Sequence, residues 1–226
     1  MEITFYGHAC FGLSSGNTHL VIDPFITDNP LAKDIDVNQI NADYILVTHA
    51  HGDHVADVES IANRTKALIV SNYEIINHFG AKSLKGHPLG AGGKKEFDFG
   101  TVKYVTAQHT SSFPDGTYGG NPGGFVINTP ETCCYIAGDT ALTMDMKLIP
   151  MTSPKLDFAI LPIGDNFTMG YEDAVIASDF IACDTIIGCH FDTFGYIKIN
   201  HEAAKKAFAN KGKKLILMQI GETISI

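Results

Sequence analysis

Short apolar runs, separated by turn residues, recur along the whole chain. They are rich in Val, Ile, Tyr and Phe and are bounded by Gly, Pro, Asp or Asn, which is the pattern of β-strands. Several runs are apolar at consecutive positions, which predicts strands covered on both faces of their sheet. The predicted strands lie within residues 3–7, 18–25, 43–49, 67–71, 101–109, 123–129, 133–140, 158–164, 185–192 and 214–221.

A smaller number of segments has apolar residues at helical spacing. Gly80 suits the end of one such helix, and Asn200 suits the N-cap of another. The predicted helices lie within residues 55–65, 72–80, 171–182 and 200–212, interleaved with the strands. This order predicts an α/β or α+β fold with a large sheet content. Because the chain has 226 residues, 45% of them hydrophobic and 18% charged, we expect one folded domain over residues 1–226.

Composition and charge disfavour several classes of function. The formal net charge of −9 argues against a nucleic-acid binder, which usually presents a basic face. The cysteines are odd in number and lack a C-x-x-C pair, so we expect buried, reduced thiols, as in a cytoplasmic protein. The N-terminal stretch lacks the pattern of a signal peptide, and no apolar run has the length of a membrane span. We therefore expect a cytoplasmic protein without a membrane partner.

Three of the ten histidines stand in one short turn, within the segment ILVTHAHGDH. His49 and His51 are two residues apart, so their rings point to the same side of an extended segment. Asp53 and His54 follow a glycine, which permits a sharp turn into the next helix. Imidazole and carboxylate groups can thereby converge on a small volume, as zinc and similar ions require. Ligands of two kinds from one turn suggest two ions side by side.

Ligand-type side chains also follow three other predicted strands. His109 follows TVKYVTAQ, Asp139 follows CCYIAG, and His190 follows DTIIGC. Active sites on sheets collect at such strand ends. A lone histidine is more often a core or surface residue, but three strand-end ligands and the histidine turn together predict a shared metal centre. Four further histidines fit no such setting and are interpreted as surface or structural residues: His19, His78, His87 and His201.

The H-x-H-x-D-H motif in HAHGDH, followed by a strand-end histidine, AGDT and a second strand-end histidine, resembles the metallo-β-lactamase superfamily. The resemblance extends from VIDPF near residue 23 to GCH at residue 190. It implies a four-layer αββα sandwich, in which two mixed β-sheets pack face to face with helices outside. It also implies two metal ions, the first held by His49, His51 and His109, the second by Asp53, His54 and His190, and both by a bridging Asp139.

The resemblance also implies roles for residues outside the ligand set. Asp23 in LVIDPF matches a buried aspartate that orients a metal-binding imidazole, and the alternative is a turn residue before Pro24. The opening GHAC and the segment PIGDNFTMGYEDA resemble small stand-alone hydrolases related to L-ascorbate-6-phosphate lactonase. In that branch His8 is expected to act beside the substrate; a hydrogen-bonded core histidine is the alternative.

Two loops are candidates for the border of this site. Residues 164–170 follow a predicted strand, and Asp165, Asn166 and Thr168 are candidate substrate contacts or plain turn residues. Residues 110–125 directly follow His109 and are rich in Gly, Pro, Ser and Asp. They form either a loop over the site or an exposed connection.

Two divalent ions would lower the pKa of a shared water, so that a bridging hydroxide becomes a nucleophile at ordinary pH. Asp139 and Asp53 would hold this hydroxide and pass its proton on. This predicts a hydrolase that cleaves an ester, lactone or phosphodiester bond in a small, anionic substrate. Zinc is the first choice for an imidazole-rich set, and manganese or iron would accept the same donors. Three lysines are candidate anion contacts or ordinary surface residues: Lys85, Lys94 and Lys95.

Two other functions stay open. A nuclease or phosphodiesterase that acts on nucleic acid would use the same centre, but RNA-processing relatives carry an added domain or arm and a basic surface, which this acidic chain lacks. A sensor or scaffold would bind metal and ligand without turnover, although the presence of all seven inferred ligands argues against a decayed site. Diiron oxygen-reducing relatives carry glutamate where this chain has His51, which favours hydrolysis. A homo-oligomer is compatible with this branch, and no sequence signal marks an interface.

Overall fold

The computed structural model describes residues 1–226 as two seven-stranded β-sheets. The strand order is β14-β1-β2-β3-β4-β5-β6 in the first sheet and β13-β12-β11-β10-β9-β8-β7 in the second. The pairs from β14 to β3 are antiparallel and those from β3 to β6 are parallel. In the second sheet the pairs from β7 to β10 are antiparallel and those from β10 to β13 parallel. Both sheets are therefore mixed, as predicted.

The strands of the first sheet are β1 (Glu2–Gly7), β2 (Cys10–Ser15), β3 (Thr18–Ile22), β4 (Tyr44–Leu46), β5 (Leu68–Ser71), β6 (Gly86–Pro88) and β14 (Thr223–Ser225). Those of the second sheet are β7 (Lys94–Phe97), β8 (Gly100–Thr106), β9 (Gly123–Asn128), β10 (Cys133–Ile136), β11 (Phe158–Pro162), β12 (Thr185–Cys189) and β13 (Lys214–Ile216). The helices are α1 (Gly52–Val55), α2 (Val58–Thr65), α3 (Tyr73–Gly80), α4 (Ile149–Thr152), α5 (Tyr171–Phe180) and α6 (His201–Ala209), with short 3-10 turns η1 (Val37–Gln39), η2 (Met144–Leu148) and η3 (Gly195–Ile197).

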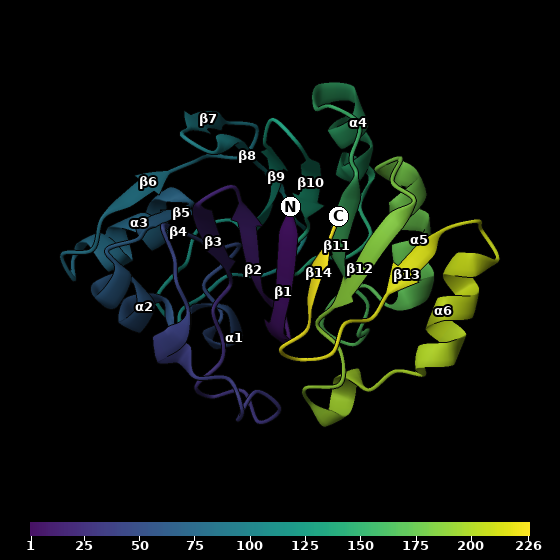
Figure 1. The fold of residues 1–226 in the computed structure, drawn as a ribbon, viewed down its shortest axis with the longest axis horizontal. Coiled ribbons are helices and arrows are strands. Elements are labelled where there is room, and N and C mark those ends of the chain that lie inside the picture. Colours follow the sequence, from purple (N-terminus) through teal and green to yellow (C-terminus); the bar gives the residue numbers. More distant parts are fainter.

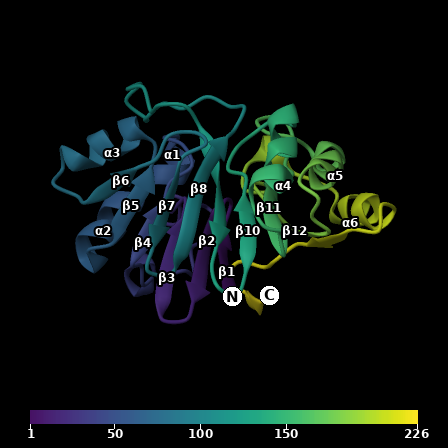
Figure 2. The same ribbon diagram turned by 90° about the horizontal axis from the view of Figure 1, so that it is seen from above.

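The elements form four layers. Helices α2 and α3 cover the outer face of the first sheet, and α4, α5 and α6 cover the outer face of the second (Figures 1 and 2). The two chain ends lie next to each other, where the N-terminal amine of Met1 donates to the carbonyl of Ile226 at 2.8 Å. The predicted αββα sandwich is confirmed.

Three apolar clusters fill the spaces between these layers. The central cluster of 21 buried residues contains side chains of both sheets, such as Phe11 and Phe125. A cluster of 18 buried residues joins the first sheet to its helices, and another of 18 joins the second sheet to α5 and α6. Strands β10 and β11 are buried at every position. This explains why their sequences are apolar throughout, because a strand between two filled layers has no exposed face.

All ten predicted strands and all four predicted helices exist, and Asn200 caps α6 by accepting from the amide of Ala203 at 3.0 Å. The elements that the pattern missed are β2, β6, β7, β14, α1 and α4. Most of them are short or lie at sheet edges, where partial exposure weakens the apolar signal. β7, for example, is exposed at its first three positions. No helix combines the length and the apolar character that crossing a membrane requires.

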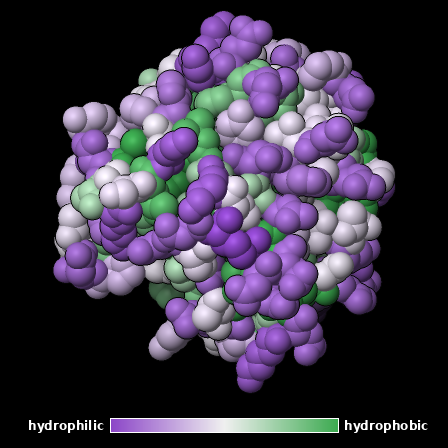
Figure 3. All heavy atoms as spheres, turned by 60° about the vertical axis from the view of Figure 1, so that its left-hand side comes forward, coloured by the Kyte–Doolittle hydropathy of each residue, from purple (hydrophilic) through white to green (hydrophobic).

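The five cysteines are buried and form no disulfide, which confirms the prediction of buried thiols: Cys10, Cys133, Cys134, Cys183 and Cys189. Burial raises the pKa of the Cys189 thiol well above its ordinary value, so this neighbour of His190 is a neutral core residue. Polar side chains cover most of the face drawn in Figure 3, and hydrophobic side chains gather there in smaller patches. That distribution agrees with the acidic, charged composition of the chain.

Candidate metal centre

The histidine turn joins β4 to α1. β4 ends at Leu46, the chain bends at Thr48, and His51, with extended backbone angles, is the N-cap residue of α1. The His51 ring makes no capping hydrogen bond, so it remains free to face the ring of His49, with 3.0 Å between His49 Nε2 and His51 Nδ1. Asp53 and His54 lie within α1, which is a single turn. One short segment thus presents four ligand-type side chains to one side.

The other predicted ligands arrive from three strands of the second sheet. His109 lies three residues after β8, Asp139 three residues after β10, and His190 directly after β12. The turn before Asp139 requires Gly138, which has φ +64° and whose position leaves 2.7 Å between an added Cβ and the Cβ of Thr48. His190 itself has φ 54°, an uncommon value for a residue with a side chain. The chain therefore adopts strained turns to direct these side chains inward.

Four of the predicted ligands surround the carboxylate of a fifth, Asp139. Four imidazole nitrogens surround its Oδ2 atom: His190 Nε2 at 3.0 Å, His54 Nε2 at 3.4 Å, His109 Nε2 at 3.6 Å and His49 Nε2 at 3.9 Å. Asp139 is 4% exposed at its side chain, so this group of rings around its carboxylate is shielded from bulk solvent. A single carboxylate at the centre of four rings is the arrangement expected of a residue between two ions.

The ligand atoms fall into two sets, each within 4.8 Å. One consists of His49, His51 and His109, and the other of His8, Asp53, His54 and His190. The first set contains the three histidines that the family resemblance assigned to one ion, while Asp139, the implied bridging residue, is in neither set. The second contains the three implied residues and also His8, which sequence reasoning had placed beside the substrate. A third set of three residues overlaps both: Asp23, His49 and His54.

Several buried polar atoms of the cluster have no partner within the protein. They include His54 Nε2 and Asp139 Oδ1. An unpartnered buried polar atom is costly, and each one needs a physical explanation. Imidazole and carboxylate donors that converge at these distances fit divalent ions of the zinc type, which would satisfy such atoms. The residues therefore fit the metal centre that the sequence predicts.

Burial makes the first set of rings good lone-pair donors. It lowers the pKa of His49 well below its ordinary value and also lowers the pKa values of His51 and His109. Neutral imidazole is the form that binds metal. These three histidines are thus neutral at ordinary pH and ready to coordinate.

The second set carries the opposite electrostatic signature. Burial alone would lower the pKa of His54 and His190, but nearby carboxylates, Asp139 foremost, outweigh it; they raise the pKa of His190 to about 9 and that of His54 well above its ordinary value. Burial likewise opposes ionisation of Asp53 and Asp139, but the charge of His54 and of its neighbours holds both pKa values below the ordinary range. The ionised carboxylates of Asp53 and Asp139 are stabilised by nearby positive charge, which a divalent ion would supply.

Asp23 orients the rings of two predicted ligands, His54 directly and His49 through Thr48. Its Oδ2 atom accepts from His54 Nδ1 at 2.9 Å and from the Thr48 hydroxyl at 2.6 Å, and its Oδ1 atom accepts from the Thr48 amide at 2.8 Å. The Thr48 hydroxyl in turn accepts from His49 Nδ1 at 3.0 Å. Both rings consequently donate from Nδ1, so Nε2 is the nitrogen that each directs into the cluster for coordination.

Comparison with known proteins places this geometry in a family. Residues 2–190 match the family described as the beta-lactamase superfamily domain. A protein named UPF0173 metal-dependent hydrolase from Christiangramia forsetii is 63% identical over 227 residues, 100% of this chain and 100% of that protein. This chain belongs to the metallo-β-lactamase superfamily. A relative from Bacillus subtilis, named UPF0173 metal-dependent hydrolase YtkL, is 39% identical and covers 100% of both chains.

Solved structures agree with this membership. The structure titled as Igni18, a metallo hydrolase from Ignicoccus hospitalis, has a TM-score of 0.89 and 30% sequence identity, over 99% of this chain and 97% of that one. An isothiocyanate hydrolase from Delia radicum gut bacteria shares the fold at a TM-score of 0.79 and 19% identity, over 100% and 99% of the two chains. The predicted superfamily is thus confirmed, while the resemblance to L-ascorbate-6-phosphate lactonase stays a prediction.

The His8 side chain is more completely buried in this chain than a residue that contacts substrate needs to be. Its side chain has no exposed surface, and its Nε2 lies 3.0 Å from Asp53 Oδ2. Its Nδ1 lies 2.9 Å from the Thr193 hydroxyl, and its ring centroid is 4.1 Å from that of His190. Its backbone has φ 58°. The structure therefore brings His8 to Asp53, and its contact with substrate stays a prediction.

The loop of residues 110–125 packs on the histidine turn. The Thr110 hydroxyl lies 3.3 Å from His51 Nε2, and the Ser111 hydroxyl accepts from the Ala50 amide at 3.2 Å. At Gly119 an added Cβ would lie 2.2 Å from the Cβ of Ala50, so only glycine permits this approach. Of the two interpretations of the loop, the structure favours a loop that borders the site.

The loop of residues 164–170 turns back on itself, closed by a bridge between Gly164 and Gly170. Asp165 and Asn166 have φ values of 61° and 55°, and the Asn166 amide donates to the carboxylate of Asp165 at 2.8 Å. That carboxylate is therefore engaged within its own turn. The roles of Asp165, Asn166 and Thr168 as substrate contacts stay predictions.

Another residue of the same loop faces the site. Phe167 lines an open hollow of about 850 Å³, whose walls also include Asp53 and Tyr196. Sequence reasoning missed Phe167 because a lone exposed aromatic residue in a loop carries no periodic signal. The hollow borders the metal centre, and only the structure reveals this border.

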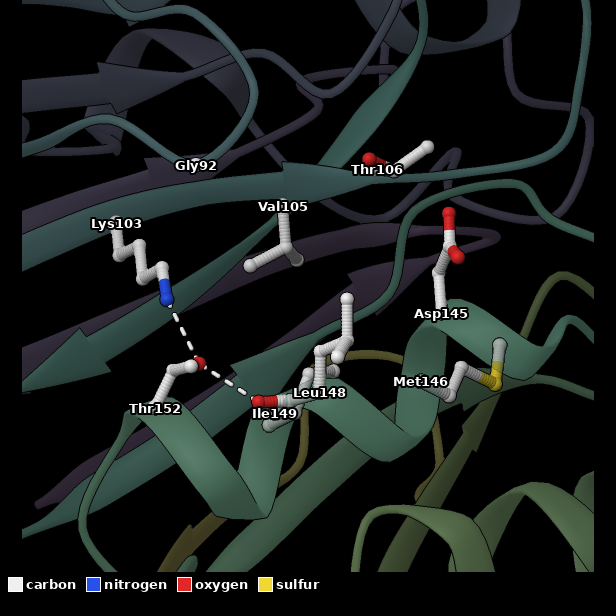
Figure 4. Close-up of a pocket in the computed structure, with 9 residues that line it drawn as sticks. All are labelled: Gly92, Lys103, Val105, Thr106, Asp145, Met146, Leu148, Ile149 and Thr152. Atoms are coloured by element: carbon white, nitrogen blue, oxygen red, sulfur yellow. Dashed lines mark hydrogen bonds between the residues drawn. The ribbon is translucent and has the colours of Figure 1, made fainter.

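The remaining sequence candidates lie outside the cluster. The histidines interpreted as structural join none of the ligand sets: His19, His78, His87 and His201. A second cavity, of about 260 Å³, lies between β8 and residues 145–152, where Lys103 donates to the Thr152 hydroxyl at 2.7 Å (Figure 4). No ligand-type residue of the cluster lines this cavity, so it is not part of the metal centre.

Proposed function

We propose that this chain, acting as one domain over residues 1–226, is a metal-dependent hydrolase with two divalent ions. It would cleave an ester, lactone or phosphodiester bond in a small molecule. The observation that carries the proposal is the carboxylate of Asp139, whose Oδ2 atom lies within 3.9 Å of four imidazole nitrogens. The names of the relatives as metal-dependent hydrolases support the same reading.

The two sets of residues divide between the two ions. His49, His51 and His109 would hold the first ion, and Asp53, His54 and His190 the second, with Asp139 between them. Zinc fits this imidazole-rich set best, and manganese or iron would accept the same donors. Bound divalent ions would supply an activated water nucleophile and a Lewis acid for the attacked bond.

The protein contributes orientation and charge. Asp53 is the most exposed carboxylate of the centre, 25% exposed at its side chain, and its lowered pKa keeps it ionised. An ionised carboxylate at this position would help to hold the second ion and would accept a hydrogen bond from the attacking water. His8 holds this carboxylate in place from behind at 3.0 Å. Asp23 fixes the rings of His49 and His54, as described above.

The test combines metal content with turnover. We expect about two ions per chain by elemental analysis after loading with zinc, and chelator-sensitive hydrolysis of bis-p-nitrophenyl phosphate or of a simple lactone. Asp139→Asn should lose at least one ion and nearly all turnover, because the residue between the ions becomes a neutral amide. His87→Ala is the matched control, since His87 lies outside every ligand set. Full metal content and wild-type turnover in Asp139→Asn would refute the bridging role.

A further inference from the structure

The open hollow beside Asp53 has a chemistry of its own. Its volume of about 850 Å³ is in the range of pockets that hold small molecules, about 300–1,000 Å³. It opens to solvent, and one of its lining residues, Asp53, belongs to the candidate metal centre.

Two aromatic pairs form these walls. Phe25 and Phe194 lie at the inner end, with ring centroids 6.4 Å apart, and each contacts the ring of His8 edge-on, at 5.5 Å and 5.2 Å. Phe167 and Tyr196 lie at the outer end, with ring centroids 6.2 Å apart. These outer rings are 50% and 78% exposed. The apolar surface of the hollow thus continues from the exposed outer pair to the inner pair beside the buried ring of His8.

The charged groups in the walls are all acidic. Asp28 and Asp53 are the charged residues that line the hollow, and neither lysine nor arginine does so. The lysines that the sequence suggested as anion contacts are also absent from the lining: Lys85, Lys94 and Lys95. The bound ion would offset the charge of Asp53, so Asp28 is the uncompensated charge of the walls. An anionic group beside Asp28 would meet like charge, whereas a neutral aromatic group would meet edge and face contacts.

We infer that the hollow binds the aromatic part of a neutral ester or lactone, with the reacting bond placed beside Asp53. This inference rests on the proposed hydrolase function and deepens it. In the reaction, water adds its oxygen to the acyl carbon, the acyl carbon–oxygen bond breaks, and the leaving oxygen takes up a proton. The walls continue inward from the exposed outer pair to Asp53, which favours a small ligand that enters the hollow over a second copy of this chain.

The kinetic test uses three methyl esters with the zinc-loaded protein. Methyl acetate lacks the ring, methyl phenylacetate carries it, and methyl 4-carboxyphenylacetate adds a negative charge to the same ring. We expect kcat/KM for methyl phenylacetate to exceed that of the other two by about tenfold or more. Phe167→Ala and Tyr196→Ala should reduce the ratio of methyl phenylacetate to methyl acetate toward one. Tyr73→Ala, which removes an exposed aromatic residue outside the hollow, should keep the wild-type ratio.

A binding measurement separates this inference from the proposed function. Benzyl alcohol has no hydrolysable bond, and we expect saturation-transfer NMR to detect its binding to the zinc-loaded wild type and a weaker signal in Phe167→Ala and Tyr196→Ala. Binding without hydrolysis of any ester would support the hollow and refute the ester chemistry. Equal kcat/KM for the three esters, or no NMR signal in the wild type, would overturn the inference. A dimer that dissociates in Tyr196→Ala with an unchanged ester ratio would also overturn it, because the hollow would then be an interface between copies.

Discussion

Replacing Asp23 with asparagine tests how the protein prepares two ligands at once. In the wild type, Oδ2 accepts from His54 Nδ1 at 2.9 Å and from the Thr48 hydroxyl at 2.6 Å, and Thr48 passes the constraint on to His49. In Asp23→Asn, an amide nitrogen in the place of Oδ2 would donate rather than accept. It would then face two other donors, His54 Nδ1 and the Thr48 hydroxyl. The His54 ring would then be driven to carry its proton on Nε2, where it blocks coordination.

The magnitude follows from the role of the residue. Loss of an outer hydrogen-bond partner of a metal ligand typically costs about 10- to 100-fold in metal affinity, which corresponds to about 1.4–2.7 kcal/mol. The metal-free protein should also lose stability, by about 1.5–3 kcal/mol, because a hydrogen bond to a charged group is lost in a buried site. Asp23 is 1% exposed, so water cannot replace that bond.

The assay is zinc competition against a chromophoric chelator, paired with urea unfolding of the metal-free protein. Asp36→Asn is the matched control, because Asp36 is an exposed cap whose Oδ1 accepts from the Asn38 amide and asparagine caps equally well. We expect the control to match the wild type in both measurements. Zinc affinity within threefold of the wild type in Asp23→Asn, together with unchanged stability, would refute the reasoning.

Three further predictions follow from the packing. Gly164→Ala should destabilise the protein by about 1–3 kcal/mol in urea unfolding and reduce zinc content, because an added Cβ would lie 2.0 Å from the carbonyl oxygen of His190; unchanged zinc content would show that the ligand does not move. Asn72→Ala should lower the free energy of unfolding by about 1 kcal/mol more than Asn200→Ala does. Both residues cap helices, but Asn72 also donates to the carbonyl of Gly119 at 2.7 Å. Equal losses would show that this additional hydrogen bond contributes no stability. Chelation should lower the melting temperature of the wild type by several degrees, because buried polar atoms of the centre lose their partners; an unchanged melting temperature would argue against bound metal.

The histidine turn and the strand-end ligands could be predicted because each is a local feature of the chain. His49 follows a buried strand, and the same holds for Asp139 and His190, so the apolar run and the ligand that ends it can be identified together. The periodicity that marks a strand depends only on which of its faces are buried. Ten strands and four helices were found on that basis, and the short, partly exposed β7 was not.

The positions of residues relative to one another across the layers could not be predicted in this way. His8 pairs with Asp53, which is 45 positions away along the chain, because the first strand and the turn after β4 end at the same edge of the sandwich. The four aromatic residues of the hollow come from three separate loops: Phe25, Phe167, Phe194 and Tyr196. Their sequence contexts share no periodic pattern, so nothing in the chain marks them as neighbours.

By itself, then, the sequence predicted the strands and the candidate ligands, since these depend on short-range patterns of burial and on a compact motif. The resemblance carried by that motif implied the family and the layered architecture. Only the tertiary structure decided that Asp139 lies among four rings, that Asp23 acts on two of them through Thr48, and that the approach to Asp53 is aromatic and acidic. The physical reason is that burial is a property of each residue, whereas contact depends on strand register and on the backbone angles of loops, which the order of apolar and polar residues leaves open.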